Sequence, residues 1–363
     1  MGIADKIKEI DDEIHRTQKN KATEYHLGLL KAKIAKLKRE QFERTSSGGG
    51  GGGGGFAAKK SGDATVVFIG WPSVGKSTLL NALTNAESKI AAYQFTTLTC
   101  IPGIMEYNGA QIQLLDLPGI LEGAHEGRGK GREVLSVARN ADLVLILLDV
   151  FRPDPTPIMT ELEAIGIRLD RKPPNISIGK RARGGVEINS TVSRTKLDER
   201  IIMGILNEYG IHNASVVLRE DIDADQLIDA LVKNRKYIPS ITVLNKTDLV
   251  SRDYLKSLRF PFVPVSADKK ENIEELKEQI YKKLNLIRIY TKPKGGEADM
   301  KRPLMMLSNS TISDVAKRLG IRKEQILKGA QVWGKSARFP GQKLGGEHIL
   351  ADGDVLTLQF ANA

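Results

Sequence analysis

The chain has 363 residues, of which 40% are hydrophobic and 27% charged, a composition typical of a soluble protein with about two or three domains. Lys and Arg number 55 against 44 Asp and Glu, and the net charge of +11 favours a polyanionic partner, either nucleic acid or an anionic membrane surface. The single cysteine, Cys100, excludes a disulfide framework and a cysteine-rich zinc site. Because no apolar run reaches about 18 residues and residues 1–13 lack the apolar core of a signal peptide, we expect a cytoplasmic protein without membrane-spanning helices.

Residues 1–47 are predicted to form a helical arm. Apolar residues recur there at helical spacing in two sets, each making one apolar stripe: Ile3, Ile7, Ile10 and Ile14, then Leu27, Leu30, Ile34 and Leu37. We expect two helices joined near residues 19–21, with lysine-rich outer faces that are either solvated or in contact with RNA or a partner. Residues 48–61, which begin with eight consecutive glycines, are predicted to be a flexible linker.

From residue 62 onward, short apolar runs alternate with helix-like stretches. The runs are strand candidates at residues 66–69, 112–115, 143–148, 241–244 and 262–265. This alternation predicts an α/β fold with a mostly parallel sheet and helices on both faces. Because the interval from Asp149 to Asn245 is too long for one crossover, we expect a core of residues 62–164 and 236–287 that is interrupted by a small α+β domain at residues 165–235.

Residues 288–363 are predicted to form a small separate domain. It contains a strand candidate at residues 303–307, a helix candidate at 313–319 and a final strand at 355–360. Residues 282–343 hold 15 Lys or Arg and 4 Asp or Glu, so their surplus of positive charge equals that of the whole chain. The preference for a polyanion therefore belongs mainly to this C-terminal region.

The strongest motif is GWPSVGKS at residues 70–77, which follows a predicted strand and continues into a predicted helix. It matches G-x-x-x-x-G-K-[ST], a P-loop whose backbone N–H groups surround phosphate oxygens at a helix N-terminus. Lys76 would reach the β- and γ-phosphates, and the Ser77 hydroxyl would ligate Mg²⁺. The predicted phosphate-binding residues are Gly70, Pro72, Ser73, Val74, Gly75, Lys76, Ser77 and Thr78.

Two further segments would complete a magnesium site. The motif DLPG begins at Asp116, at the end of a strand candidate, so Asp116 is placed to hold Mg²⁺ through water and the Gly119 N–H to contact a γ-phosphate. Upstream, Thr97 is predicted to complete the Mg²⁺ shell when a γ-phosphate is present, with Thr96 as the alternative. Lys76, Thr97 and Gly119 are therefore the predicted catalytic residues.

A base-recognition motif, NKTD, begins at Asn245 and again follows a strand candidate. The carboxylate of Asp248 can accept hydrogen bonds from guanine N1–H and its exocyclic amine, a pair that adenine does not offer, so an ATPase is disfavoured. Ser266 and Ala267 follow another strand candidate and can close over the base from the other side. We expect Asn245, Lys246, Asp248, Ser266 and Ala267 to bind guanine.

The P-loop, DLPG and NKTD motifs follow one another in this order, each at a predicted strand end. With these motifs the chain resembles the developmentally regulated GTP-binding proteins (DRG) within the Obg-like translation-factor GTPases. The motifs that carry the resemblance are GWPSVGKS at residues 70–77, AYQFTT at 92–97, DLPG at 116–119, the glycine-rich stretch to residue 132 and IYTKPKG at 289–295. The C-terminal DGDVLTLQF resembles a TGS domain, a β-grasp module. The insert and the N-terminal helices resemble the extra α+β domain and the helical arm of that family.

The resemblance implies a ribosome-associated GTPase active in translation. It implies binding of GTP or GDP with Mg²⁺, contact with rRNA or tRNA through the basic C-terminal domain and the insert, a regulatory partner protein in some lineages, and no membrane partner. Potassium is a further candidate cofactor, although Ser73 stands where relatives that use it carry asparagine. Ile120 stands where many small GTPases carry a water-orienting glutamine, so we expect slow intrinsic hydrolysis. His125 and Glu126 are either water-positioning residues or exposed loop residues.

Two other classes of function stay open at this point. One is a GTP-dependent signalling switch that acts on a protein target, which nuclease-resistant association with a protein would favour. The other is a nucleic-acid-binding module in which the nucleotide is only structural, and then Lys76→Ala would leave every activity intact. Raised salt should weaken a ribosome interaction based on phosphate contacts, because such contacts release counterions.

Overall fold

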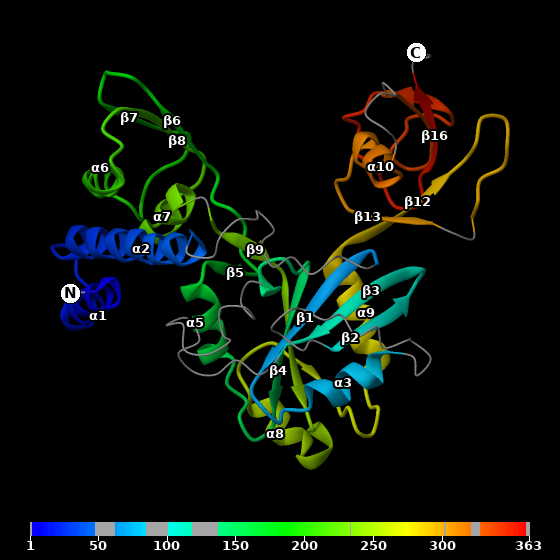
Figure 1. The fold of residues 1–363 in the computed structure, drawn as a ribbon, viewed down its shortest axis with the longest axis horizontal. Helices are drawn as coiled ribbons and strands as arrows, with labels where there is room; N and C mark the ends of the chain where they lie inside the picture. Colours follow the sequence, from blue (N-terminus) through cyan, green and yellow to red (C-terminus); the bar gives the residue numbers. More distant parts are fainter. Residues whose placement is uncertain are drawn as a thin grey trace. The chain divides into compact units, whose positions relative to one another are not determined.

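The computed structural model describes residues 2–47, 62–84, 101–117, 137–232, 234–300, 303–320 and 327–360. The chain divides into two compact units (Figure 1): unit 1 comprises residues 1–55 and 162–237, and unit 2 comprises residues 56–161 and 238–363. None of the described helices is long and apolar enough to cross a membrane. The predicted domain boundaries stay predictions, and the predicted linker at residues 48–61 lies outside the described residues.

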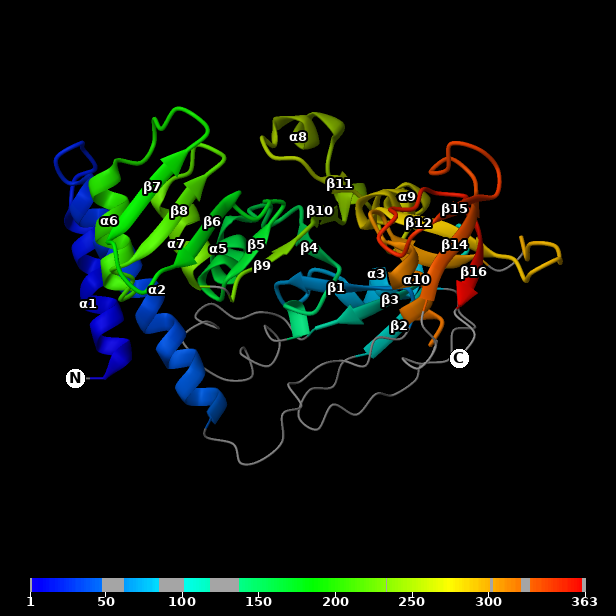
Figure 2. The ribbon, with the colours of Figure 1, turned by 90° about the horizontal axis from the view of Figure 1, so that it is seen from above.

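Unit 2 contains a six-stranded sheet in the order β11-β10-β4-β1-β3-β2 (Figure 2). Its strands are β1 (Ala64–Gly70), β2 (Ile101–Tyr107), β3 (Ala110–Asp116), β4 (Leu143–Asp149), β10 (Ser240–Asn245) and β11 (Val263–Pro264). Neighbouring strands are parallel except β2 and β3, which pair as an antiparallel hairpin. β1 and β4 are buried along their whole length, as unbroken apolar runs require in a covered parallel sheet. The mostly parallel sheet is therefore confirmed.

Parallel strands bring distant residues to one edge of this sheet. Gly70, Asp116, Asp149 and Asn245 are the last residues of β1, β3, β4 and β10. Helices α3 (Lys76–Leu83) and α9 (Ile273–Leu284) pack on the sheet and on each other. The remaining helical elements of the core are α5 (Thr156–Ala164), the 3-10 turn η2 (Thr247–Leu249) and α8 (Arg252–Ser257). Ligands of open α/β sheets bind outside the carboxyl ends of the strands, so we expect a ligand site at this edge.

The C-terminal part of unit 2 forms a second sheet in the order β13-β12-β16-β14-β15. Its elements are β12 (Leu286–Thr291), β13 (Leu304–Leu307), α10 (Ile312–Arg318), β14 (Leu327–Trp333), β15 (Gln342–Leu344) and β16 (Val355–Phe360). Helix α10 begins with a capping box between Thr311 and Asp314. Ile312 and Val315 of this helix share a buried core with one face of the sheet. The sequence predicted β13, α10 and β16, whereas β12, β14 and β15 were missed.

Unit 1 joins the N-terminal helices to the inserted domain. Its elements are α1 (Ile3–Arg16), α2 (Glu24–Ser47), β5 (Ile167–Leu169), β6 (Ile176–Lys180), β7 (Val186–Ser190), α6 (Glu199–Glu208), β8 (Ala214–Leu218), α7 (Ala224–Val232) and β9 (Lys236–Ile238). α1 and α2 form the predicted hairpin, and α2 lies between α1 and the pair α6 and α7 (Figure 1). The insert supplies a three-stranded sheet, β6-β8-β7, and β5 at its start pairs with β9, which directly follows it.

A second face of α2 explains this assembly. Besides the predicted stripe, α2 presents the small residues Gly28 and Ala32 to the insert; Ala32 is fully buried in the core formed by α6, α7 and the sheet. A side chain at Gly28 would press on Ile201, and one at Gly204 would collide with Tyr25. Helices with small residues at their contact can approach closely, so the arm and the insert share one hydrophobic core.

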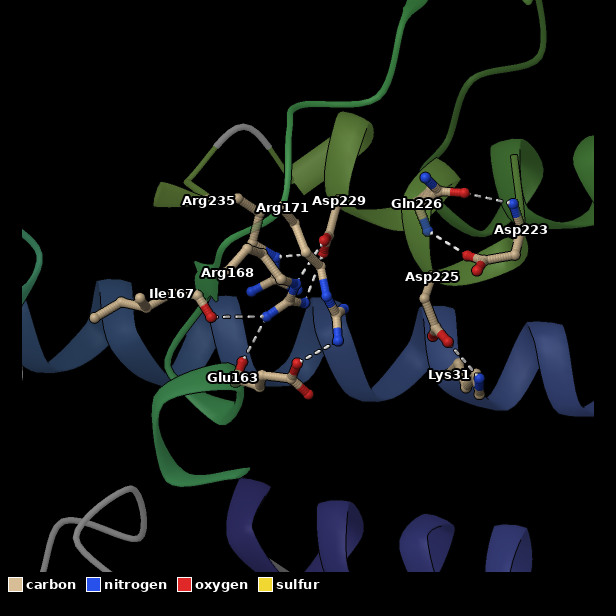
Figure 3. Close-up of polar contacts among 10 residues, drawn as sticks. All are labelled: Lys31, Glu163, Ile167, Arg168, Arg171, Asp223, Asp225, Gln226, Asp229 and Arg235. Atoms are coloured by element: carbon tan, nitrogen blue, oxygen red, sulfur yellow. Dashed lines mark hydrogen bonds and ion pairs between the residues drawn. The ribbon is translucent and has the colours of Figure 1, made fainter. Parts of the chain in front are cut away.

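A buried carboxylate fastens both connections of the insert to α7 (Figure 3). Asp229, which is 8% exposed, accepts hydrogen bonds from Arg168 Nε at 2.6 Å, Arg168 Nη2 at 2.8 Å and Arg235 Nε at 2.7 Å. Arg168 lies on β5, where the chain enters the insert, and Arg235 directly precedes β9, where it leaves. Nearby, Lys31 of α2 pairs with Asp225 of α7 at 2.6 Å. Polar contacts thus add to the apolar packing that holds unit 1 together.

Candidate nucleotide-binding site

The loop between β1 and α3 lies very close to two other strands. A side chain at Gly70 would collide with the carbonyl oxygen of Leu147, and one at Gly75 with the amide of Asn245. Gly75 has φ +91° and Ser73 has φ +65°, both in the left-handed region. Close approach and backbone conformation therefore both require the motif's glycines, and the loop has the tight curvature of an anion-binding turn at a helix N-terminus.

Lys76 begins α3 and its ammonium lies inside the loop. Nζ donates to the carbonyl oxygens of Gly70 at 3.2 Å and Trp71 at 2.9 Å, and the residue is only 9% exposed. Burial lowers the pKa of Lys76, and the charge of Asp116 opposes this only in part. A phosphate beside the ammonium would supply the missing negative charge, so the residue suits a polyphosphate ligand.

Asp116 and Ser77 form the candidate magnesium site. The Ser77 hydroxyl donates to Asp116 Oδ2 at 2.7 Å, which brings β3 and α3 together. Asp116 Oδ1 is buried and has no hydrogen-bond partner among the described residues. Burial raises the pKa of Asp116, while the Ser77 hydrogen bond and the Lys76 charge oppose the rise. A hydroxyl and a carboxylate with a free buried oxygen are hard ligands of the kind Mg²⁺ prefers, so these residues fit the ion.

Asn245 and Lys246 hold the P-loop from β10. Asn245 Nδ2 donates to the carbonyl oxygen of Val74 at 2.9 Å, and its Oδ1 accepts the N–H of Ala267 at 3.0 Å. Lys246 Nζ donates to the carbonyl oxygen of Ser73 at 3.0 Å. Two of the NKTD side chains thus contact the phosphate loop directly, and Asn245 also ties it to the predicted base-closing segment.

Asp248, the predicted guanine acceptor, is engaged by Ser266 and Lys269. It lies in the short turn η2, with Lys269 Nζ 3.4 Å from its Oδ2. A hydrogen bond from the Ser266 side chain, assisted by Lys269, lowers the pKa of Asp248. The carboxylate is therefore ionised at neutral pH, as an acceptor for the two guanine donors must be.

The described residues account for most of the predicted site. Pro72, Ser73, Ser77 and Thr78 are exposed around the loop and the start of α3, whereas Val74 is buried. The structure brings the P-loop, Asp116, and the NKTD and Ser266–Ala267 segments to one edge of the sheet. Thr97, Gly119 and His125, together with the alternatives Thr96 and Glu126, lie outside the described residues, so their roles stay predictions.

Sequence reasoning missed two contributors to this site. Asp149 Oδ2 lies 3.0 Å from Lys246 Nζ, and Asp149 Oδ1 accepts the N–H groups of Phe151 and Arg152. The Arg152 guanidinium in turn lies 4.1 Å from the ring centroid of Trp71, the second residue of the P-loop motif. One signal was available, because Asp149 is an acidic residue at the carboxyl end of a predicted parallel strand.

Known proteins match the chain over nearly its whole length. A family model described as 50S ribosome-binding GTPase matches residues 65–180, one described as the C-terminal region of the MMR_HSR1 domain matches residues 183–286, and the TGS domain matches residues 287–359.

Three relatives illustrate the similarity. An uncharacterised GTP-binding protein of Methanocaldococcus jannaschii is 52% identical over 99% of this chain and 93% of its own. Developmentally-regulated GTP-binding protein 1 of Xenopus laevis is 48% identical over 98% of this chain and 99% of its own. Developmentally-regulated G-protein 3 of Arabidopsis thaliana is 48% identical over 98% of both chains.

Proposed function

Because the chain belongs to the developmentally regulated GTP-binding protein family, we propose that it hydrolyses GTP to GDP and phosphate with Mg²⁺ and that the bound nucleotide controls its association with the ribosome. It is a GTP-binding protein with a P-loop GTPase domain and a C-terminal TGS domain. The hydrolysis and the ribosome are the proposed parts.

The observation that carries the nucleotide chemistry is Asp116 Oδ1, which is buried without a hydrogen-bond partner among the described residues, beside Ser77 and the desolvated ammonium of Lys76. Lys76 would bind the β- and γ-phosphates, and Ser77 would hold Mg²⁺ with Asp116 acting through water. When bound, Mg²⁺ would neutralise negative charge on the nucleotide phosphates. Asp248 would accept the two guanine donors.

Slow hydrolysis is part of the proposal. Thr97 and Gly119 would contact the metal and the γ-phosphate, so that their loops order with GTP and relax after hydrolysis. Ile120 cannot orient a water molecule, so the reaction needs another group: His125, a partner protein or a monovalent cation such as potassium. Ser73 in the P-loop counts against potassium.

Ribosome association is supported by charge and by family. The 15 Lys or Arg and 4 Asp or Glu of residues 282–343 make the C-terminal region suited to RNA phosphates. The family model that matches the GTPase core is described as a ribosome-binding GTPase. We propose that the protein is a cytoplasmic translation factor whose basic TGS domain and inserted domain contact rRNA or tRNA on the ribosome.

A base-swapped nucleotide gives a sharp test. Asp248→Asn replaces a carboxylate by an amide that can donate, so the variant should prefer xanthine, which carries a carbonyl where guanine carries its amine. We expect the wild-type protein to co-sediment with ribosomes when a non-hydrolysable GTP analogue is added but not when the corresponding xanthosine triphosphate analogue is added. Asp248→Asn should co-sediment only with the xanthosine analogue. GDP should weaken the association, and moderate salt should weaken it steeply.

The outcomes separate the alternatives. Equal pelleting of both proteins in every nucleotide would mean that the nucleotide does not control binding. No pelleting in any state would leave a GTP-binding protein and would favour a protein target. GTP turnover, measured as phosphate release with and without ribosomes, tests the enzymatic part separately: no turnover above a Lys76→Ala control in either condition would refute hydrolysis.

A further inference from the structure

The TGS sheet has one face that α10 covers and one that it does not. Side chains alternate along each strand, and residues paired in register share a face. Val332, Leu356 and Ile289 belong to the core that includes α10. Their neighbours along the strands, Trp333, Val355 and Tyr290, therefore lie on the opposite face.

On that opposite face, two aromatic residues stand in one row. Tyr290 of β12 pairs with Val355 of β16, and Val355 pairs with Trp333 of β14. Both aromatic residues are partly exposed. Tyr290 and Trp333 thus lie on one face on either side of β16, and aromatic side chains on one face of a sheet can stack planar bases.

Basic and amide side chains continue the same face. Lys292, the residue after β12, places Nζ 4.8 Å from the ring centroid of Trp333. In the next row, Gln331 pairs with Lys343 of the edge strand β15, and Lys343 is exposed. Near the start of β12, Arg288 forms an ion pair with Asp352 at 2.7 Å, which neutralises the negative charge of that carboxylate. Positive charge therefore adjoins the aromatic row from two strands.

We propose that this face, formed by Tyr290, Trp333, Gln331, Lys292 and Lys343, binds single-stranded RNA. Bases stack on the two rings, and the lysines pair with the adjoining phosphates. A base that stacks on Trp333 takes the place of the Lys292 ammonium, which then reaches a phosphate.

The alternative nucleic-acid ligand is a duplex, and the face does not suit it. A duplex stacks its bases internally and offers the protein its phosphates and 2′-hydroxyls, so aromatic rings would gain nothing from it. The inference rests on the proposed association with RNA, and it names the form of RNA and the residues that contact it.

The test measures binding of the full chain to a fluorescein-labelled 12-nucleotide single-stranded RNA by anisotropy, with a 12-base-pair RNA duplex as competitor. We expect Trp333→Leu to weaken binding about tenfold, because a stacked base is lost, and Trp333→Phe to restore most of it. Lys343→Gln should weaken binding several-fold and reduce the salt dependence by about one phosphate contact.

A matched control lies on the other side of the domain. Lys317→Gln removes the same charge from α10, where Lys317 is exposed and pairs with Asp314. It should change RNA affinity less than about twofold. Because Lys343 is exposed at a sheet edge, its variant tests the inference even if Trp333→Leu fails to fold.

Two results would overturn the inference: equal losses from Lys343→Gln and Lys317→Gln, or duplex competing as well as single strand. Its failure is distinguishable from that of the proposed function. If wild type pellets with ribosomes while Lys343→Gln binds single-stranded RNA as wild type does, only the inference fails. If wild type binds the oligonucleotide through this face but never pellets, only the ribosome proposal fails.

Discussion

The nucleotide site and unit 1 are assembled in different ways. The site gathers short motifs that stand at the ends of parallel strands, and each motif already implies its own geometry, as the tight turn at Gly75 shows. Unit 1 joins α2 to helices more than 150 residues later through small side chains such as Ala32. Local backbone chemistry is visible in a sequence, whereas complementarity between two distant surfaces is not.

Removing the P-loop lysine should have the largest effect and should stay within the site. Lys76→Ala should weaken GTP and GDP binding about 100-fold, because a buried cation–phosphate contact is worth about 2–5 kcal/mol. Binding is measured by titration calorimetry, with exposed Lys256→Ala as the control. The midpoint temperature of thermal unfolding without nucleotide should not fall, because burial of the Lys76 ammonium costs desolvation free energy. A loss of fold would contradict this view of the residue.

Overfilling the contact between arm and insert should have the converse effect. Ala32 is fully buried, so Ala32→Leu should destabilise unit 1 by about 2 kcal/mol, and exposed Lys33→Leu should not. Hydrogen exchange should accelerate in α2 and α6 while β1 keeps its protection, and GTP affinity should change less than about twofold. If β1 lost protection equally, the two units would not be independent.

A smaller effect is expected at the residue that sequence reasoning missed. Asp149→Asn keeps the oxygen that accepts from Phe151 and Arg152 but removes the charge that holds Lys246. We expect GDP affinity to fall about tenfold, equivalent to about 1.4 kcal/mol. Asp253→Asn, an exposed charge on α8, serves as the matched control. An unchanged affinity would show that the P-loop carbonyl alone positions Lys246.

The smallest effect concerns a tyrosine between α6 and α2. The Tyr209 hydroxyl donates to the carbonyl oxygen of Ala32 at 3.4 Å, and burial raises its pKa to about 12. An unfolded tyrosine titrates near pH 10, so this contribution to stability is complete below about pH 10 and is lost as the pH rises toward 12. In Tyr209→Phe, the ultraviolet titration should lack one tyrosinate step near pH 12. A step lost near pH 10 instead would refute the burial of this phenol.

Much of the fold and the site could be predicted because strand and motif signals are local. The buried strands β1, β3, β4 and β10 appear as apolar runs, and each ends at a chemically distinctive residue. β12, β14 and β15 were missed because these strands are only partly buried, which leaves Arg288, Lys328 and Lys343 among the apolar residues. α2 was predicted with one stripe because small residues such as Gly28 carry no hydrophobic signal.

The sequence by itself predicted the phosphate loop, the carboxylate expected to read guanine and the positions of the buried strands along the chain, because each of these signals lies within about ten consecutive residues. The tertiary structure alone decided that Asp149 anchors Lys246, that Asp229 fastens both connections of the insert, and that Tyr290 and Trp333 share one face. These contacts depend on register and packing between distant segments, which only the folded chain specifies.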